Sequence, residues 1–223
     1  VNSQTPLVIE GLAKDWPALA NAERRWSNID LLNNRISADR FVRVEVGKSY
    51  MDPNVIVSEV SMQEYLSLLK KSEDHTKSPF YLAQYELKNI PEMYEDVIIP
   101  EFCSTAKGDL YHVNLWFGSP LGNVSPCHYD PFNNILVQVI GKKTVEIIHP
   151  GYSKYLYPAL GTIQKNTSRV DFENPNLQKF PLFNEVEKHV TELQPGDGVF
   201  IPYKWWHFCK SSELSCSVNF WWL

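Results

Sequence analysis

The 223-residue sequence has no apolar run long enough to cross a membrane, and no signal peptide opens it. Its four cysteines are widely scattered and form no Cys-x-x-Cys pair: Cys103, Cys127, Cys209 and Cys216. In a chain of this length such cysteines are typical of reduced thiols rather than of a disulfide framework. We therefore expect a protein of the nucleus or cytoplasm that has no membrane partner.

Long basic runs are also absent, since none exceeds Lys-Lys or Arg-Arg. The 21 Lys and Arg residues are outnumbered by 26 Asp and Glu residues, which gives a net charge of −5. Nucleic-acid binding depends on neutralising phosphates, so this balance argues against a DNA or RNA partner. No repeat, low-complexity tract or Gly/Ser linker divides the chain, and we expect one domain over residues 1–223.

The hydrophobic content of 43% is enough to bury a sizeable core. To about residue 78 the pattern mixes strands with helices. Alternating or short apolar runs predict strands at 6–11 and 41–47. Helices are predicted to begin near Ser27, with Leu31, Leu32 and Ile36 turned inward, and after the capping box at 61–64.

From about residue 79 to residue 223 the chain is rich in short strands that are separated by glycine turns. The predicted strands are 80–84, 113–117, 134–140, 143–148, 199–202 and 215–221. Gly141-Lys142 predicts a hairpin between the third and fourth of these strands, and residues 194–198 predict a tight turn. Many short strands of this kind indicate a β-sandwich or β-barrel, with the helices in an N-terminal flank.

The tripeptide His128-Tyr129-Asp130 carries an imidazole and a carboxylate two residues apart, so in a strand both point to one face. His207, just after a predicted strand, can supply a third ligand. Two histidines and one carboxylate form the facial triad of non-haem Fe(II) oxygenases, which leaves coordination positions open. His-x-Asp alone is a weak motif that also occurs by chance. The other histidines are interpreted as ordinary surface or core residues: His75, His112, His149 and His189.

Two cysteines adjoin these ligands. Cys127 would point to the face opposite His128, whereas Cys209 would share the face of His207 if the strand continues. A thiolate at that position could favour zinc. Free cysteine is usually a small packed side chain, and this is the interpretation we prefer.

Lys143 lies in an otherwise apolar predicted strand. On pattern alone it could face solvent, as most lysines do. Inside a barrel its ammonium would require an anion, because a buried unpaired charge is prohibitive. The distal carboxylate of 2-oxoglutarate would meet that requirement through charge-assisted hydrogen bonds.

The stretch 125–143, SPCHYDPFNNILVQVIGKK, resembles the jumonji-C hydroxylases. Further similar segments follow in the family's order or extend the match toward the N-terminus: 156–158, 168–175, 195–197, 205–207, 218–222, 8–11, 44–47 and 81–84. The resemblance covers nearly the whole chain and implies a double-stranded β-helix (jelly-roll, cupin-like) barrel. Within the family the chain is most similar to the small arginyl-hydroxylase branch, of the jumonji-C domain-containing protein 5 type. It is also similar to the asparaginyl hydroxylase of hypoxia-inducible factor.

The resemblance implies two cofactors, Fe(II) and 2-oxoglutarate. Three residues would ligate the iron: His128, Asp130 and His207. Five would contact 2-oxoglutarate, at its distal carboxylate or near its metal-chelating end: Lys143, Tyr81, Ser125, Asn134 and Asn219. For the tyrosine and the two asparagines, ordinary strand packing is the alternative interpretation.

Glu45 is the principal candidate for substrate recognition. It alternates with Val44 and Val46, so its carboxylate lies on the opposite face of the strand. In the arginyl-hydroxylase branch the matching glutamate recognises a guanidinium, which implies an arginyl residue in a protein or peptide substrate. An aromatic wall residue is expected shortly after this strand, but residues 52–55 read DPNV, so we expect a remodelled pocket. Trp116 is a candidate pocket wall, with core packing as the alternative.

The expected function is therefore Fe(II)- and 2-oxoglutarate-dependent protein hydroxylation, which couples cofactor decarboxylation to C–H hydroxylation. An N-methyl-lysine demethylase would use the same centre and release formaldehyde. An RNA-nucleoside hydroxylase is disfavoured by the acidic balance, and a non-enzymatic binding barrel would form no succinate. No nucleophile–base arrangement supports a protease.

Overall fold

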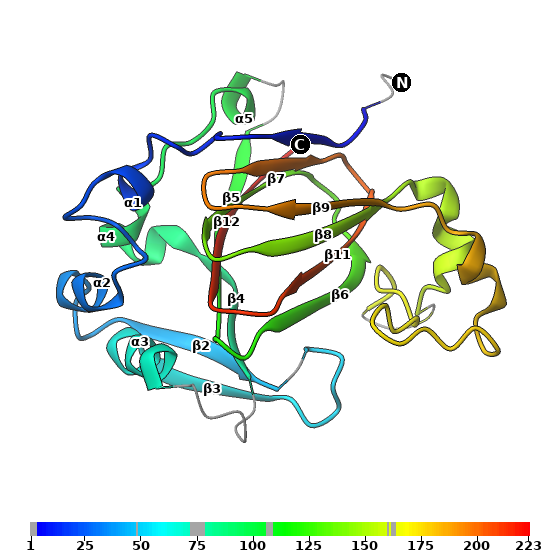
Figure 1. Cartoon of the computed structure of the whole chain (residues 1–223), viewed down its shortest axis with the longest axis horizontal. Helices are drawn as coiled ribbons and strands as arrows, with labels where there is room; N and C mark the ends of the chain where they lie inside the picture. Colours follow the sequence, from blue (N-terminus) through cyan, green and yellow to red (C-terminus); the bar gives the residue numbers. More distant parts are fainter. Residues whose placement is uncertain (1–3, 48, 72–78, 106–108, 160, 162–163) are drawn as a thin grey trace.

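The computed structural model describes residues 4–47, 49–71, 79–105, 109–159, 161 and 164–223. In this part of the chain the strands form two antiparallel sheets (Figure 1). The larger sheet contains, in spatial order, β1 (Leu7–Ile9), β10 (Gly198–Ile201), β7 (Asn133–Ile140), β12 (Ser215–Trp222), β5 (Leu110–Gly118), β4 (Phe80–Glu86), β2 (Phe41–Val46) and β3 (Ile56–Ser61). The smaller sheet contains β6 (Asn123–Tyr129), β11 (Trp206–Ser211), β8 (Lys143–Ile148) and β9 (His189–Leu193).

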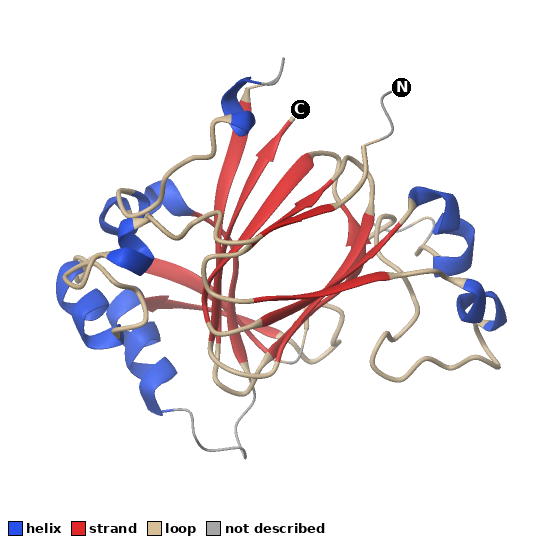
Figure 2. Cartoon of the chain, turned by 45° about the horizontal axis from the view of Figure 1, so that its top comes forward, coloured by secondary structure: helices blue, strands red, loops and turns tan. Residues whose placement is uncertain are grey.

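The described helices lie outside the strands, which enclose a common interior (Figure 2). They are α1 (Pro17–Ala20), α2 (Ile29–Arg35), α3 (Met62–Lys71), α4 (Pro91–Tyr94) and α5 (Phe102–Thr105), with 3-10 helices η1 (Leu87–Asn89), η2 (Pro150–Leu156) and η3 (Pro181–Glu185). In Figure 1 helices α1 to α4 lie on one side of the strands, and η2 and η3 lie on the other. Over the described residues, no helix combines the length and apolarity needed to span a membrane.

From β5 to β12 the chain changes sheet at every step except from β8 to β9, which pair with each other in the smaller sheet. Strands β5, β7, β10 and β12 belong to the larger sheet, whereas β6, β8, β9 and β11 belong to the smaller one. This crossing pattern is that of a jelly-roll barrel. The expectation of a mainly β fold with flanking helices is confirmed.

The predicted hairpin at Gly141-Lys142 is wrong, because β7 and β8 lie in different sheets. The turn carries the chain from one sheet to the other. Gly141 adopts a left-handed φ of +63°, and a Cβ there would lie 2.1 Å from the carbonyl oxygen of Leu214. The amide of Lys142 donates to the Glu213 carboxylate at 2.8 Å. A glycine turn between apolar strands has the same local pattern in both arrangements, so only long-range pairing distinguishes them.

The N-terminal elements extend the larger sheet. Strand β1 pairs with β10, and β2 pairs with both β3 and β4. The capping box is confirmed on one side, since Ser61 Oγ accepts from the Glu64 amide at 3.1 Å. Helix α2 begins after Asn28 rather than Ser27, because the Asn28 side chain accepts from the Leu31 amide at 3.1 Å.

The main hydrophobic core lies between the helices and the outer face of the larger sheet. The fully buried Tyr65 of α3 donates its hydroxyl proton to the carbonyl of Phe117 in β5 and accepts from the Leu82 amide in β4 at 3.2 Å. This tyrosine holds α3 against the two strands and satisfies its own buried hydroxyl. The helices therefore support one wall of the barrel interior.

We predict that Gly141→Ala destabilises the protein more than Gly161→Ala does. Both glycines have a left-handed φ, +63° and +79°. Among the described residues nothing lies within 4 Å of a Cβ at position 161, whereas one at 141 meets the Leu214 carbonyl. The backbone strain should cost each variant about 1–2 kcal/mol, and the collision should cost Gly141→Ala about 1–3 kcal/mol more. Chemical denaturation measures the difference, and equal losses would contradict the steric argument.

Candidate metal centre

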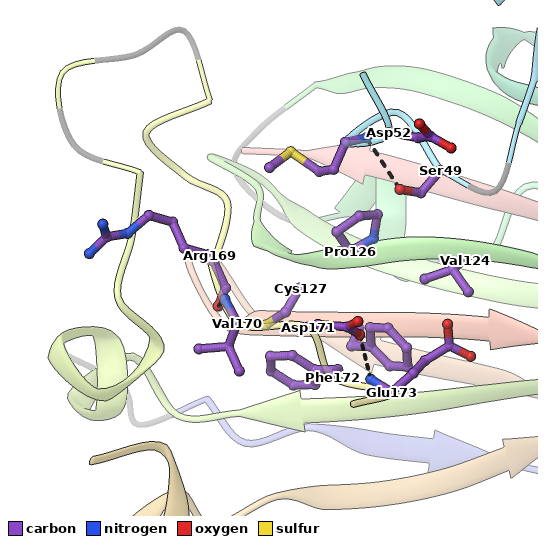
Figure 3. Close-up of a pocket in the computed structure, with 13 residues that line it drawn as sticks. Ser49, Asp52, Val124, Pro126, Cys127, Arg169, Val170, Asp171, Phe172 and Glu173 are labelled. Atoms are coloured by element: carbon purple, nitrogen blue, oxygen red, sulfur yellow. Dashed lines mark hydrogen bonds between the residues drawn. The ribbon is translucent and has the colours of Figure 1, made fainter. Parts of the chain in front are cut away.

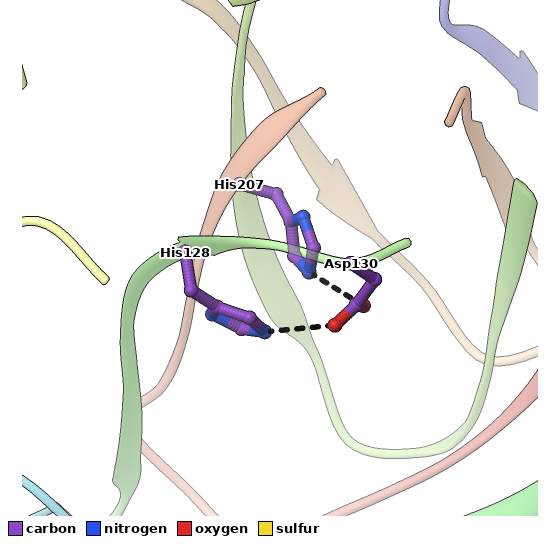
Figure 4. A group of neighbouring side chains, drawn as sticks. All are labelled: His128, Asp130 and His207. Atoms are coloured by element: carbon purple, nitrogen blue, oxygen red, sulfur yellow. Dashed lines mark ion pairs between the residues drawn. The ribbon is translucent and has the colours of Figure 1, made fainter. Parts of the chain in front are cut away.

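The candidate metal ligands meet where β6 pairs with β11. In this register His128 lies opposite His207, and Asp130 follows β6 directly. The Asp130 carboxylate lies 3.8 Å from His128 Nε2 and 3.5 Å from His207 Nε2 (Figure 4). One donor atom from each side chain lies within 4.8 Å of the other two. Among the described residues no other group of three His, Cys, Asp or Glu side chains is so arranged.

A β-bulge in β6 orients the residues around this site. His207 lies opposite His128 and Cys209 lies opposite Ser125, so two residues of β6, Pro126 and Cys127, face a single residue of β11. In a regular strand Ser125 and His128, three positions apart, would point to opposite faces. The bulge turns both into the same cavity. Proline is tolerated there because a bulge interrupts the ladder and needs no N–H donor.

Backbone carbonyls fix the two imidazole rings. His128 Nδ1 lies 2.7 Å from the carbonyl oxygen of Pro126, and His207 Nδ1 lies 3.2 Å from that of Trp205. Since a carbonyl only accepts, each Nδ1 carries the proton and each Nε2 keeps its lone pair toward Asp130. Such second hydrogen bonds are typical of metal-ligating histidines. Burial, followed by the nearby His128, lowers the pKa of His207 to about 4, which keeps this ring neutral. The donor set therefore fits a divalent metal such as Fe(II).

The predicted cofactor residues line one inner cavity together with the triad. These residues are Tyr81, Ser125, Asn134, Lys143 and Asn219, beside Trp116, Leu136, Ile201 and Cys209. Lys143 is only 4% exposed, and no carboxylate among the described residues pairs with it. Burial lowers the pKa of its ammonium. A buried cation that lacks an anion fits the distal carboxylate of 2-oxoglutarate.

Two hydrogen-bonded groups complete the inner cavity. Trp116 Nε1 donates to Asn219 Oδ1 at 2.8 Å, and Asn219 Nδ2 donates to Asn134 Oδ1 at 2.9 Å. The Tyr81 hydroxyl hydrogen-bonds to Ser125, although burial raises the pKa of Tyr81 overall. Both groups present fixed polar atoms to a ligand in the cavity. At Tyr81, Asn134 and Asn219 a side chain can therefore pack within its sheet and also contact a ligand.

The two cysteines beside the ligands lie as predicted. Cys209 lines the inner cavity, and burial raises the pKa of its thiol to about 11, so it is protonated at neutral pH. Cys127 points the other way, into a cavity of about 340 Å³ on the outer face of β6 (Figure 3). Phe172 and Phe208 line that cavity, and none of the triad does. In the described chain all four cysteines are free and buried.

A mouth of about 290 Å³ opens on the other side of the triad. It shares His128, Asp130 and Trp116 with the metal site and inner cavity, and Glu45 lines it. Burial raises the pKa of the Glu45 carboxyl. No basic side chain among the described residues pairs with this carboxylate. The mouth therefore presents an uncompensated acid beside the candidate metal ligands.

The expected aromatic wall is present, but at Tyr50 rather than at 52–55. The Tyr50 hydroxyl lies 3.4 Å from Thr167 Oγ1 across the mouth, and burial raises the pKa of Tyr50 to about 12. Tyr50 is the only aromatic residue between Gly47 and Val55, a sequence feature that could have identified it. The pocket was predicted to be remodelled because 52–55 lack an aromatic residue, but Tyr50 supplies an aromatic side chain from two positions earlier.

The remaining described histidines lie away from the triad. His112 pairs with Glu86, and His149 accepts from the Gly151 amide at 3.0 Å. His189 lies beside the Trp205 ring, with 6.2 Å between ring centroids. His75 is outside the described residues.

Comparison with known proteins places this geometry in a family. The sequence matches the family described as a cupin-like domain over residues 1–223. It is 37% identical to lysine-specific demethylase JMJ30 of Arabidopsis thaliana over 98% of this chain and 50% of that protein. It is 38% identical to lysine-specific demethylase 8 of Xenopus tropicalis, over 98% and 48%. Jumonji C domain-containing protein 5 of Drosophila melanogaster is 34% identical, over 97% and 54%. The chain spans about half the length of these curated relatives.

We predict that Asp130→Ala abolishes metal binding while the barrel stays folded. The carboxylate bridges the space between the two imidazoles, and it is not part of a hydrophobic cluster. Loss of a residue that hydrogen-bonds to a metal ligand usually weakens metal binding by up to about 100-fold. Loss of a ligand itself should therefore weaken Mn(II) or Ni(II) binding by at least that factor. Metal titration and circular dichroism measure both properties. Asp171→Ala, in the outer cavity, is the control, and unchanged metal affinity in Asp130→Ala would refute the assignment.

We predict that Lys143→Met weakens 2-oxoglutarate binding by ~2–5 kcal/mol, the usual cost of removing one partner of a buried charge pair. The same substitution should stabilise the ligand-free protein, because it removes a buried ammonium that has no counter-charge. Isothermal titration with 2-oxoglutarate and denaturation without it measure the two effects.

The stability difference should depend on pH. The folded pKa of Lys143 is lowered from 10.5, so the unfolded chain binds more protons between the two values and the wild type gains stability as pH rises there. Lys143→Met lacks this gain, so its advantage should shrink as pH approaches 10.5. If the stability difference between Lys143→Met and the wild type stayed constant or grew with pH, folding would not lower the pKa of Lys143.

Proposed function

The chain belongs to the cupin-like domain family of JmjC proteins, and on that premise we propose that it is an Fe(II)- and 2-oxoglutarate-dependent hydroxylase of arginyl residues in proteins. JmjC enzymes are oxidoreductases that use Fe(II) and 2-oxoglutarate. We also propose that residues 1–223 act as one oxygenase domain, in the nucleus or cytoplasm.

The inner cavity would hold both cofactors. His128, Asp130 and His207 would ligate Fe(II). Lys143, Tyr81 and Ser125 would bind the distal carboxylate of 2-oxoglutarate, with Asn134 and Asn219 near its chelating end. Bound together, the cofactors would supply oxidation by dioxygen, in which one oxygen atom enters succinate as 2-oxoglutarate loses carbon dioxide and the other hydroxylates a substrate C–H bond.

The protein's own contribution is orientation and exclusion of water. The carbonyls of Pro126 and Trp205 hold the two imidazoles by their Nδ1 protons. Leu136 and Ile201 form an apolar wall of the cavity. A dry site strengthens the pairing between the lysine and its anion.

The observation that carries the arginine assignment is the half-buried carboxylate of Glu45 in the mouth. A cationic side chain of the substrate would compensate it. A guanidinium offers two parallel donors to a carboxylate and a flat face to aromatic rings, whereas an ammonium is a point charge. Tyr50 and Trp116 line the same mouth and supply such rings. Arginine therefore fits this mouth better than lysine.

N-methyl-lysine demethylation is the second candidate. Two of the similar proteins carry the name lysine-specific demethylase. A carboxylate would also attract a methylated ammonium, and the same centre would hydroxylate its methyl group, which leaves as formaldehyde. Mass spectrometry of peptides after turnover separates the two reactions, because hydroxylation adds one oxygen and demethylation removes a methylene.

We predict that the wild type hydroxylates an arginyl peptide in preference to matched lysyl and asparaginyl peptides, and that Glu45→Gln loses this preference. The substitution keeps the shape of the side chain but removes the charge that pairs with the guanidinium. Loss of one charged partner should cost ~2–5 kcal/mol in kcat/KM for the arginyl peptide. Product mass and succinate release measure turnover.

Glu59→Gln is the matched control for this prediction. Glu59 is an exposed carboxylate on β3, opposite Arg43 of β2. Its loss should leave turnover unchanged. If Glu45→Gln hydroxylates the arginyl peptide as well as the wild type does, the guanidinium contact is refuted, and a preference for methyl-lysine would favour demethylation.

A further inference from the structure

Strand β4 contains a bulge at the edge of the mouth. Leu82 lies opposite Phe117 and Tyr85 lies opposite Leu115, so the two residues between them on β4 face Trp116 alone. Gln84, the second of these residues, has a φ of +47°. A non-glycine residue in the left-handed region is strained, and such strain is often found at binding sites. Bulges near such sites commonly redirect a side chain.

The bulge leaves the Gln84 side chain available at the mouth. Gln84 lines the mouth together with Glu45 and Tyr50, and it is exposed. The described part of the chain offers its carboxamide no hydrogen-bond partner. A carboxamide carries two donors and one acceptor, the same groups that a peptide bond requires. No structural contact explains why this strained residue is a glutamine.

Trp221 provides an independent observation in the same mouth. Its side chain is 6% exposed, yet its Nε1–H has no acceptor among the described residues. The ring is held by stacking on Phe132, with centroids 5.2 Å apart and planes inclined by 15°. A buried donor without an acceptor is unfavourable, and in native proteins such groups often serve a ligand. Both side chains thus lack partners where a substrate would enter.

We propose that Gln84 is a positioning residue that hydrogen-bonds to the main chain of an extended polypeptide substrate beside the target residue. Trp221 supplies a second donor, to a main-chain carbonyl. The division of roles follows from charge, since the neutral carboxamide and indole suit peptide groups while Glu45 suits the cationic side chain. The substrate class is then a polypeptide rather than a free amino acid, which has no flanking peptide bonds. This inference rests on the proposed protein hydroxylase function.

The first test compares Gln84→Ala and Gln84→Gly with the wild type. Peptide affinity is measured on Mn(II)-loaded protein with 2-oxoglutarate, so that binding is read without turnover. Each variant should bind peptide about 3- to 10-fold more weakly, as expected for one neutral hydrogen bond. Affinity for 2-oxoglutarate should not change. Gln84→Gly should be at least as thermally stable as the wild type, because glycine relieves the left-handed strain.

Weaker peptide binding without a loss of thermal stability indicates a positioning role. If Gln84 had a structural role, its substitution would lower thermal stability and peptide affinity together. Gln194→Ala is the matched control, because Gln194 is an exposed carboxamide outside the mouth whose side chain, over the described residues, hydrogen-bonds to Glu192 alone. Unchanged peptide affinity in both Gln84 variants would overturn the proposal.

A double-mutant cycle then identifies the contact. Each amide flanking the target is replaced in turn by an ester, which removes its N–H and weakens its carbonyl as an acceptor. One ester should weaken binding to the wild type by about the same factor as Gln84→Ala and cause no further loss in that variant. Additive losses at every position would overturn the main-chain contact.

The cycle is run on whichever peptide the wild type prefers, arginyl or methyl-lysyl. A preference for methyl-lysine with a coupled Gln84 would refute only the arginine assignment. An arginyl preference without coupling would refute only the role of Gln84.

Discussion

The pairing of β6 with β11 is the constraint on which the site depends. It sets His128 opposite His207, although the two histidines are far apart in the sequence. A slip of one residue would turn either imidazole out of the interior, because side chains alternate across a strand. The bulge at Pro126-Cys127 also sets the directions of two neighbouring side chains. Ser125 reaches the inner cavity, and Cys127 packs into the outer apolar cluster instead of beside the candidate metal ligands.

Charge is divided along the barrel interior. The buried ammonium of Lys143 lies at the inner cavity, whereas the carboxylate of Glu45 lies at the mouth, and His128 and Asp130 line both spaces. Each charge lacks a counter-ion among the described residues. Burial lowers the pKa of Lys143 and raises that of Glu45, so it favours the neutral form of both groups. An anionic cofactor is thereby favoured inside and a cationic side chain outside. On the proposed function, the reverse occupation would place like charges together, so this polarity would order an anionic cofactor and a cationic substrate side chain around the metal.

Much of this arrangement could be predicted from local sequence. Alternation identified β2 closely, the turn at Gly141-Lys142 placed the start of β8, and the two-residue spacing of His128 and Asp130 predicted their convergence. The exchange of strands between sheets could not be predicted, because Gly141 makes a turn of ordinary appearance whose partners are set by the distant Leu214 and Glu213. Neither bulge has a local pattern, since a bulge is defined by the partner strand and not by the residues that form it. The aromatic wall was missed because Tyr50 lies in a loop, where no periodicity assigns a direction.

Two residue pairs show why the irregularities matter more than the regular strands. Ser125 and His128, on β6, are three positions apart and both line the interior. Tyr81 and Gln84, on β4, have the same spacing and line the inner cavity and the mouth. A strand of period two cannot bring residues at this spacing to one face. Each bulge interrupts the hydrogen bonds between neighbouring strands. On β4 the bulge also holds the backbone of Gln84 at a left-handed φ of +47°. Such costs persist only where surrounding structure holds them. Here the bulges bring Ser125 and His128 into one cavity, and Tyr81 and Gln84 into the two adjoining spaces, at a spacing of three that a regular strand would send to opposite faces.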